Sequence, residues 1–311
     1  MSAEGGTKAI VAALAANLGI AATKFLAFAL TQSSSMLAEA IHSVADSGNQ
    51  LLLLIGGRRA RKDATPLHPF GYGRERYVYG FIVAVVLFSV GGLFALFEAY
   101  EKWKEPHGIE GRWWWVPLAV LGLAIAMESF SFRTAIQESN RVRGGRSWPE
   151  FVRTARAPEL PVILLEDFAA LIGLFFALFG VGLTLLTGNG LWDAAGTAMI
   201  GLLLVAVAVL LAIEMKSLLI GEAATPEHSR AIKAALVGQG VGSVIHMRTL
   251  HLGPEELLVA AKIGVDGADS AVEVARAIDA AEQRVREAVP IARVIYLEPD
   301  LDRGRTGASA W

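Results

Sequence analysis

The chain has 311 residues, of which 54% are hydrophobic and only 19% are charged, and its formal net charge is −2. A soluble protein of this length carries about 25% charged residues. The composition therefore favours a membrane protein, and the small net charge gives no reason to expect nucleic acid as a partner. Because the sequence contains no cysteine, disulfides, thiolate metal sites and cysteine nucleophiles are excluded.

The apolar residues gather in six segments that are long enough to be membrane spans, since a span needs about 20 mostly apolar residues. The first is predicted to remain as a span and not to be removed as a signal peptide, because it lacks an A-x-A-like cleavage pattern. The short neutral connections TQSSS and LTGNGLW predict helical hairpins. The six predicted spans are Lys8–Leu30, Met36–Gly56, Tyr77–Tyr100, Trp113–Phe132, Glu159–Leu183 and Trp192–Ile213.

Two longer connections carry the basic residues that orient a membrane protein. RRARKDATPLHPFGYGRER contains six Arg or Lys, and QESNRVRGGRSWPEFVRTARAP contains five. By the positive-inside rule, both loops and both termini are predicted to lie in the cytoplasm. Because no transit peptide or long low-complexity loop is recognised, the prediction is a multi-pass protein of a prokaryotic plasma membrane.

The sequence pattern changes after Met215, where short helical patterns alternate with strand-like runs. The order helix, strand, strand, helix, strand predicts a small open-faced α+β sandwich of ferredoxin-like type. Ser270 and Glu273 are spaced as a capping box for the second of these helices. The predicted organisation is a transport domain over residues 1–215, a cytoplasmic domain over 216–300 and a disordered tail over 301–311.

Polar residues interrupt the second predicted span. His42 and Asp46 are four residues apart and share one helix face, which Asn49 continues. A carboxylate at the centre of a span costs about 2.5–3.5 kcal/mol, so residues of this kind are usually functional. Imidazole nitrogen and carboxylate oxygen are ligands of zinc and related divalent cations, so this face is a candidate metal site.

The fifth predicted span supplies an acidic pair, Glu166 and Asp167. Asp46 lies ten residues before Gly56, and Asp167 lies eight residues after Glu159, where the fifth span begins. At about 1.5 Å per residue the two Asp carboxylates lie roughly 15 and 12 Å from the inner surface, near the midplane where transporters often hold substrate. Because adjacent helical residues point about 100° apart, at most one of the acidic pair is expected to aim directly at the site.

A purely structural interpretation is the alternative for each of these polar residues, because a buried His or Asp can pair with another helix. Lys24 of the first span is the obvious partner for the second span. Asn17, Glu39 and Glu128 are expected to be interhelical partners or to line an entry route. The matching depth of the two acidic spans favours the metal site over this alternative.

Several motifs together resemble those of the cation diffusion facilitator family of divalent-metal/proton antiporters, over nearly the whole chain. They are SSSMLAEAIHSVADSGNQ, HPFGYGRERY directly after the second span, LWDAAGTAMIGLLL, LLIGEAATPE and the terminal VIYLEP. The resemblance implies six spans, a cytoplasmic metallochaperone-like domain and a homodimer. It also implies that His42, Asp46 and Asp167 are metal ligands, because they match the ligand positions of the second and fifth spans.

Departures from the family pattern affect metal binding in both domains. Ile163 replaces the usual His of the fifth span, so Glu166, Asn49 or water is left to complete the ligand set, and LLED is typical of a subgroup with this substitution. Zinc is the first expectation, and manganese, cobalt, nickel and iron are alternatives, because ligand type and geometry drive selectivity. Lys262 and Tyr296 stand near positions where His is often found, so the soluble domain is expected to dimerise without a binuclear metal site.

The leading hypothesis is secondary active export of a divalent cation from the cytoplasm in exchange for protons. Metal and proton compete for the same imidazole and carboxylate groups, and an imidazole with an ordinary pKa of about 6.5 suits that exchange. The metal is then a substrate, and neither a resident cofactor nor a catalytic residue is expected. No G-x-x-x-x-G-K-[ST] motif is present, so ATP is not the expected energy source.

The alternative is a non-transporting membrane scaffold or metal sensor with a degenerate site. An intramembrane hydrolase is disfavoured, because the sequence contains neither an H-E-x-x-H nor a G-x-S-x-G motif.

Overall fold

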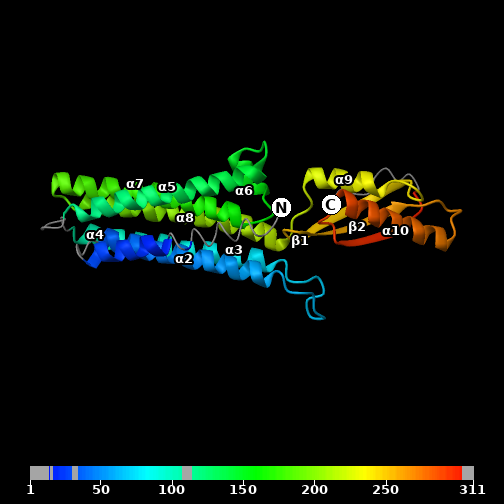
Figure 1. Ribbon diagram of the computed structural model, residues 1–311, viewed down its shortest axis with the longest axis horizontal. Helices are drawn as coiled ribbons and strands as arrows, with labels where there is room; N and C mark the ends of the chain where they lie inside the picture. Colours follow the sequence, from blue (N-terminus) through cyan, green and yellow to red (C-terminus); the bar gives the residue numbers. More distant parts are fainter. Residues whose placement is uncertain (1–13, 15–16, 30–33, 107–113, 303–311) are drawn as a thin grey trace. The chain divides into compact units, whose positions relative to one another are not determined.

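The computed structural model of the chain describes residues 14, 17–29, 34–106 and 114–302. These residues divide into two compact units. The first comprises Met1–Arg59 and Glu75–Lys216, and the second comprises Ala60–Arg74 and Ser217–Trp311. Figure 1 shows that the first unit is helical and that the second contains the strands.

Long helices form the first unit, and Figure 1 shows them running side by side as a bundle. Helix α5 packs on α7, and α2 packs on α3. The third predicted span is continuous from Glu75 to Lys104, although its middle is π-helical. The helical elements are the segment Asn17–Ala29, α2 (Ser34–Arg59), α3 (Glu75–Val86), the π-helix η1 (Leu87–Leu93), α4 (Phe94–Lys104), α5 (Val116–Arg143), α6 (Trp148–Thr154), α7 (Glu159–Thr187) and α8 (Leu191–Ile220).

Four helices in the described part of the chain are long and apolar enough to cross a membrane: Glu75–Lys104, Val116–Arg143, Glu159–Thr187 and Leu191–Ile220. They contain the third, fifth and sixth predicted spans and the fourth from Val116 onward, because Trp114 and Trp115 form a turn before this helix and Trp113 lies outside the described residues. The described parts of the first two predicted spans are helical as well. Residues 8–13, 15, 16 and 30 of the first span fall outside the described residues.

The first unit has the reverse of a soluble protein's polarity. Phe97, Phe130 and Phe179 are exposed, whereas the charged side chains of Lys24 and Glu166 are buried. Large exposed apolar surfaces mark contact with a partner or a membrane, and buried charges in spans face the interior of a bundle. The arrangement fits an integral membrane protein.

Two helical features extend beyond the sequence prediction. The predicted fourth span ends at Phe132, whereas α5 continues to Arg143. The short helix α6 then forms inside the basic connection, where no helix was predicted. Its local cause is a capping box, because the Ser147 side chain accepts from the Glu150 amide while the Glu150 side chain accepts from the Ser147 amide.

Glycines allow α7 and α8 to cross closely. A Cβ added at Gly180 would lie 2.9 Å from the Trp192 carbonyl oxygen, and one at Gly196 would lie 2.7 Å from the Phe176 carbonyl oxygen. Both obstacles are backbone atoms, which cannot rotate away. The two helices of the α7–α8 hairpin predicted from LTGNGLW therefore approach each other closely at glycines, as is common between membrane helices.

The second unit contains a three-stranded sheet and two helices in the order that the sequence predicted. The strands are ordered β1-β2-β3, with β1 and β2 antiparallel and β2 and β3 parallel. Apolar residues of α9, β2 and α10, including Ile232, Val259 and Val285, form its core. The elements are α9 (Pro226–Leu236), β1 (Ser243–Gly253), β2 (Glu256–Gly264), α10 (Ala271–Ala288) and β3 (Val294–Asp300).

Local predictions for this unit can be compared with single residues. The capping box of Ser270 and Glu273 at the start of α10 is confirmed. On β1, His246 is exposed and His251 is buried. Lys262 forms ion pairs with Glu298 and Asp300, at 3.1 and 3.3 Å. Residues 303–311 of the predicted tail lie outside the described residues.

Candidate metal site

The candidate site begins on α2, where His42 and Asp46 lie one helical turn apart. The His42 Nε2 atom is 3.4 Å from Asp46 Oδ2, and both side chains are buried. The i, i+4 spacing therefore places an imidazole and a carboxylate together, as the sequence predicted. A nitrogen and an oxygen donor at this separation can bind one divalent cation after a small adjustment.

Helix α7 approaches this face of α2 through Glu166. The Asn49 Nδ2 atom donates a 2.7 Å hydrogen bond to Glu166 Oε1, and both residues are buried. The bond joins the second and fifth predicted spans. The carboxyl groups of Asp46, Asp167 and Glu128 are close enough to interact electrostatically with that of Glu166, so four acidic side chains gather at this level of the bundle.

Asp167 has a different neighbour. The Ser131 hydroxyl of α5 donates a 2.8 Å hydrogen bond to Asp167 Oδ2. The adjacent acids therefore engage different helices, in agreement with the expected 100° separation. Glu166, for which the sequence gave the weaker indication, is the one hydrogen-bonded to α2, although Asp167 remains close enough to Asp46 for an electrostatic interaction.

Two oxygen atoms at the junction of α2 and α7 are buried and have no hydrogen-bond partner among the described residues: Asn49 Oδ1 and Glu166 Oε2. An unsatisfied buried polar atom costs about 1–3 kcal/mol, and a bound ion or water is a common explanation for one. Both atoms are of the types that coordinate divalent cations. In the described part of the chain, however, no three His, Asp or Glu side chains lie close enough together to hold a metal ion.

The π-helix η1 lies beside this cluster, a feature that sequence analysis missed. A Cβ added at Gly91 would lie 3.6 Å from His42 Nδ1 and 3.3 Å from Leu204 Cδ1. Single turns of π-helix are frequent at functional sites. The adjacent glycines Gly91 and Gly92 were the available signal, because both are buried and a side chain at either would meet α8.

Other residues highlighted by the sequence lie near the cluster or in the core. The Lys24 ammonium donates a 2.9 Å hydrogen bond to the Ser43 hydroxyl, so the first span contacts α2 next to His42. Ile163, which stands where the family usually has His, is buried in the apolar core. The side chain of Glu39 lies outside the described residues.

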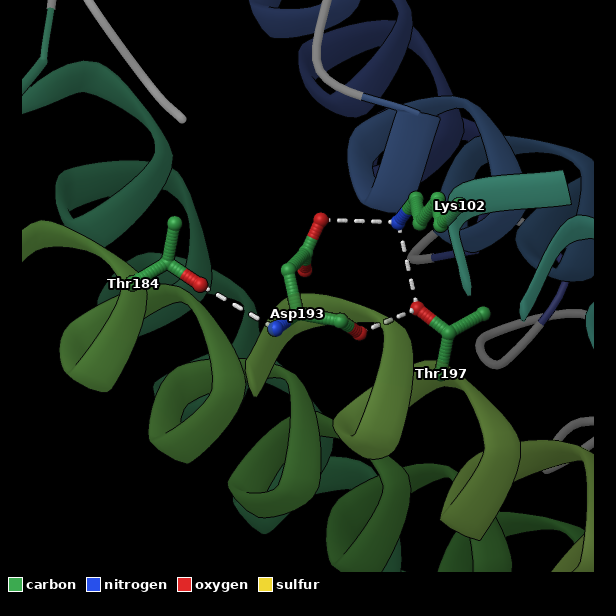
Figure 2. A network of polar contacts seen from close by, with 4 residues as sticks. All are labelled: Lys102, Thr184, Asp193 and Thr197. Carbon is green, nitrogen blue, oxygen red and sulfur yellow. Dashed lines mark hydrogen bonds and ion pairs between the residues drawn. The ribbon is translucent and has the colours of Figure 1, made fainter. Parts of the chain in front are cut away.

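A second polar network lies where α4 ends and α8 begins (Figure 2). The Lys102 ammonium donates to Asp193 Oδ2 at 2.8 Å and to the Thr197 hydroxyl at 3.1 Å. The Thr197 hydroxyl donates to the Asp193 carbonyl, and the Asp193 amide donates to the Thr184 hydroxyl of α7 at 3.0 Å. The third span is thereby tied to the α7–α8 hairpin. At the other end of the same span, Arg76 forms an ion pair with Glu159 of α7.

The helical unit, with apolar side chains outside and a carboxylate-rich cluster buried at mid-span, defines a multi-pass integral membrane protein of the kind that carries ions or small polar solutes. Residues 10–220 match the cation efflux transmembrane domain. The chain therefore belongs to the cation efflux family, the cation diffusion facilitators, as its motifs predicted. This is a family of transporters and not of enzymes.

Individual relatives support the assignment. The chain is 31% identical over 271 residues to the proton-coupled zinc antiporter SLC30A9, mitochondrial, of Xenopus laevis, covering 86% of this chain and 48% of that protein. Its human counterpart is 32% identical over 247 residues, covering 78% and 43%. The metal cation efflux system protein CzcD of Cupriavidus metallidurans is 27% identical over 234 residues, covering 74% and 68%. The chain thus spans about half the length of the two antiporters.

Proposed function

We propose that the protein exports a divalent transition-metal cation, zinc in the first instance, in exchange for protons. One observation carries the proposal: the buried His42–Asp46 pair of α2 shares its helix face with Asn49, which is hydrogen-bonded to Glu166 of α7. Nitrogen and oxygen donors from two spans are the groups that a midplane cation site requires. The names of the frog and human relatives, which state proton-coupled zinc antiport, support the choice of metal and of coupling ion.

The proposed ligands are His42, Asp46, Glu166 and Asp167. Glu166 is favoured as the main contribution of α7, because its hydrogen bond to Asn49 holds it against α2. Asp167 would join the set by rotating away from Ser131 or would act by its charge. In this proposal Glu166 supplies the ligand that is lost where Ile163 replaces His. The chain would then belong to the subgroup with LLED in the fifth span.

Proton coupling follows from the charges at mid-span. Asp46, Asp167 and Glu128 interact electrostatically with Glu166, and their mutual repulsion in a low-dielectric interior is large. A divalent cation relieves that repulsion, and so do protons. Because ligands must be deprotonated to bind metal, cation entry releases protons, and proton entry from the opposite side releases the cation.

The remaining architecture is proposed from the sequence and the family. It has six spans in a transport domain over residues 1–215 and a cytoplasmic metallochaperone-like domain over 216–300. The second unit's order of strands and helices supports the ferredoxin-like type. The chain assembles as a homodimer. The basic loops after α2 and after α5 face the cytoplasm together with both termini, and the prokaryotic plasma membrane stays a prediction.

The test is metal-driven proton flux in proteoliposomes that contain the purified protein. Zinc added on one side should drive opposite proton movement, and His42→Ala and Asp46→Ala should each abolish it while the variants still reconstitute. Unchanged flux in both variants would sink the site assignment. Zinc binding without proton flux under any gradient would favour the scaffold or sensor instead.

A further inference from the structure

Asn49 occupies an unusual position for an amide side chain. It lies one turn beyond Asp46 on the His42 face of α2 and is fully buried. Its Nδ2 group donates to Glu166 Oε1. An ionised Glu166 carboxylate requires this orientation of the amide, because it accepts hydrogen bonds and would repel the amide oxygen. The Oδ1 atom is therefore directed away from Glu166 Oε1, and no hydrogen-bond donor among the described residues meets it.

The second carboxylate oxygen of Glu166 likewise has no hydrogen-bond donor among the described residues. This atom, Glu166 Oε2, is buried as well. One hydrogen bond thus joins two side chains that each retain one buried oxygen without a donor. Two such oxygens, carried by one hydrogen-bonded pair of side chains beside other carboxyl groups, present lone pairs where a cation is the natural partner.

We propose that Asn49 is a specificity-determining ligand: its Oδ1 atom binds the transported cation together with Glu166 Oε2, and its N–H group holds Glu166 in position. This inference rests on the proposed function, because it concerns the same site and assigns it a further ligand and a metal preference.

The chemical consequence is an oxygen-rich ligand set. With His42 contributing one nitrogen, the donors from Asp46, Asn49 and Glu166 are oxygens, and Asp167 could add another. Zinc sites are typically four-coordinate with nitrogen or sulfur ligands, whereas carboxylate and carbonyl oxygens suit manganese and other harder cations with more ligands. The site is therefore expected to accept Mn²⁺ and Co²⁺ beside Zn²⁺, and Asn49 sets the ratio.

The experiment compares metal binding by the full-length protein in detergent, measured by calorimetry with MnCl₂, CoCl₂ and ZnCl₂ in turn. Asn49→Leu keeps the approximate volume of the side chain but removes both the amide oxygen and the N–H donor. We expect this variant to weaken Mn²⁺ binding at least tenfold more than Zn²⁺ binding. Asn49→His supplies nitrogen in place of oxygen and should shift the ratio further toward zinc. It also provides a second variant if Asn49→Leu does not fold.

A spectroscopic readout separates ligation from structural support. Four-coordinate Co²⁺ absorbs visible light far more strongly than six-coordinate Co²⁺, and the absence of cysteine leaves no thiolate bands to obscure the spectrum. Loss of the Asn49 oxygen should therefore strengthen the Co²⁺ absorption. Thr184→Val is the matched control, because it removes one buried hydrogen bond of α7 at the network of Figure 2 and should leave both the spectrum and the metal ratio unchanged.

Equal weakening of all three metals with an unchanged Co²⁺ spectrum would overturn the role of Asn49, even where the wild-type protein binds and transports zinc. Failure of the proposed function is distinguishable from this result. A wild-type protein that binds metal but moves no protons overturns the proposed transport alone, whereas one that binds none of the three metals overturns both proposals.

Discussion

Two polar clusters lie inside the helical unit: the mid-span cluster of His42, Asp46, Asn49 and Glu166, and the network of Lys102, Asp193, Thr197 and Thr184 (Figure 2). In the second, the ammonium group meets a carboxylate and a hydroxyl, and each hydroxyl of the network also bonds to the backbone. In the first, carboxyl groups interact with one another, and the Asn49 Oδ1 and Glu166 Oε2 atoms have no hydrogen-bond partner among the described residues.

If the first cluster binds the transported cation, as we propose, this difference separates a structural role from a functional one. A satisfied polar network strengthens the fold and leaves little for a ligand to gain. A cluster with surplus negative charge weakens the fold and can be relieved by a cation, which is the usual exchange of stability for activity. The two clusters should therefore respond in opposite ways to the removal of a charge.

The largest effect is expected from Glu166→Gln. Removing this charge takes away a cation ligand but also relieves repulsion from Asp46 and Asp167. Metal affinity should fall about 100-fold or more, since even the supporting partners of a metal ligand are worth about 10–100-fold. The thermal unfolding temperature of the metal-free protein should stay the same or rise. A variant that transports normally, or that is strongly destabilised, would contradict the comparison.

Lys102→Met should show the opposite pattern. It leaves Asp193 buried without its ammonium partner, and removing one partner of a buried ion pair costs about 3–5 kcal/mol. The unfolding temperature should fall clearly, while the metal affinity of the folded fraction is retained. The exchanged pair Lys102→Asp with Asp193→Lys is the control and should recover part of the lost stability. Selective loss of metal affinity in Lys102→Met would assign the network to transport instead.

Ser131→Ala sharpens the comparison at Asp167, the acid of the pair that is hydrogen-bonded to α5 and not to α2. If Ser131 orients a metal ligand, the variant should weaken metal binding about tenfold and lower stability by about 1 kcal/mol. Calorimetry and thermal unfolding on the same preparation give both values. Unchanged metal affinity would restrict the α7 ligand to Glu166.

The sequence was most informative where function depends on spacing along one helix. The sequence predicted the pairing of His42 with Asp46 and, through the family motifs, the approach of the second and fifth spans. The sequence did not predict that Glu166, and not Asp167, would be hydrogen-bonded to α2. The rotation of α7 about its own axis decides this, and it depends on how α7 packs against α5 and α2. Lys102 resembled an ordinary loop charge, because its partner Asp193 lies 91 residues away.

The π-helix at Leu87–Leu93 was also beyond sequence reasoning. Its hydrogen-bond pattern depends on how Gly91 and Gly92 approach α2 and α8, and a pair of glycines inside a span is compatible with an ordinary α-helix too. Helix α6 could have been predicted, since Ser147 and Glu150 with an intervening Pro149 form a recognisable start signal.

The smallest effect is expected at a third polar cluster, the capping box of Ser270 and Glu273 in the second unit, which is satisfied but exposed to water. Ser270→Ala should cost about 1 kcal/mol. Hydrogen bonds from the Ser270 side chain and amide hold the pKa of Glu273 below its ordinary value of 4.5. The stabilisation from the ionised form is therefore present above about pH 4.5 and is lost as the pH falls through the folded-state pKa.

Amide exchange of the first turn of α10 in the full-length protein, corrected for intrinsic rates, should show protection that decreases in acid for the wild type and changes less for Ser270→Ala. An equal acid response in both proteins would show that the cap does not act through this carboxylate. If Ser270→Ala lowers stability more than Lys102→Met does, burial is not what makes the Lys102 network stabilising.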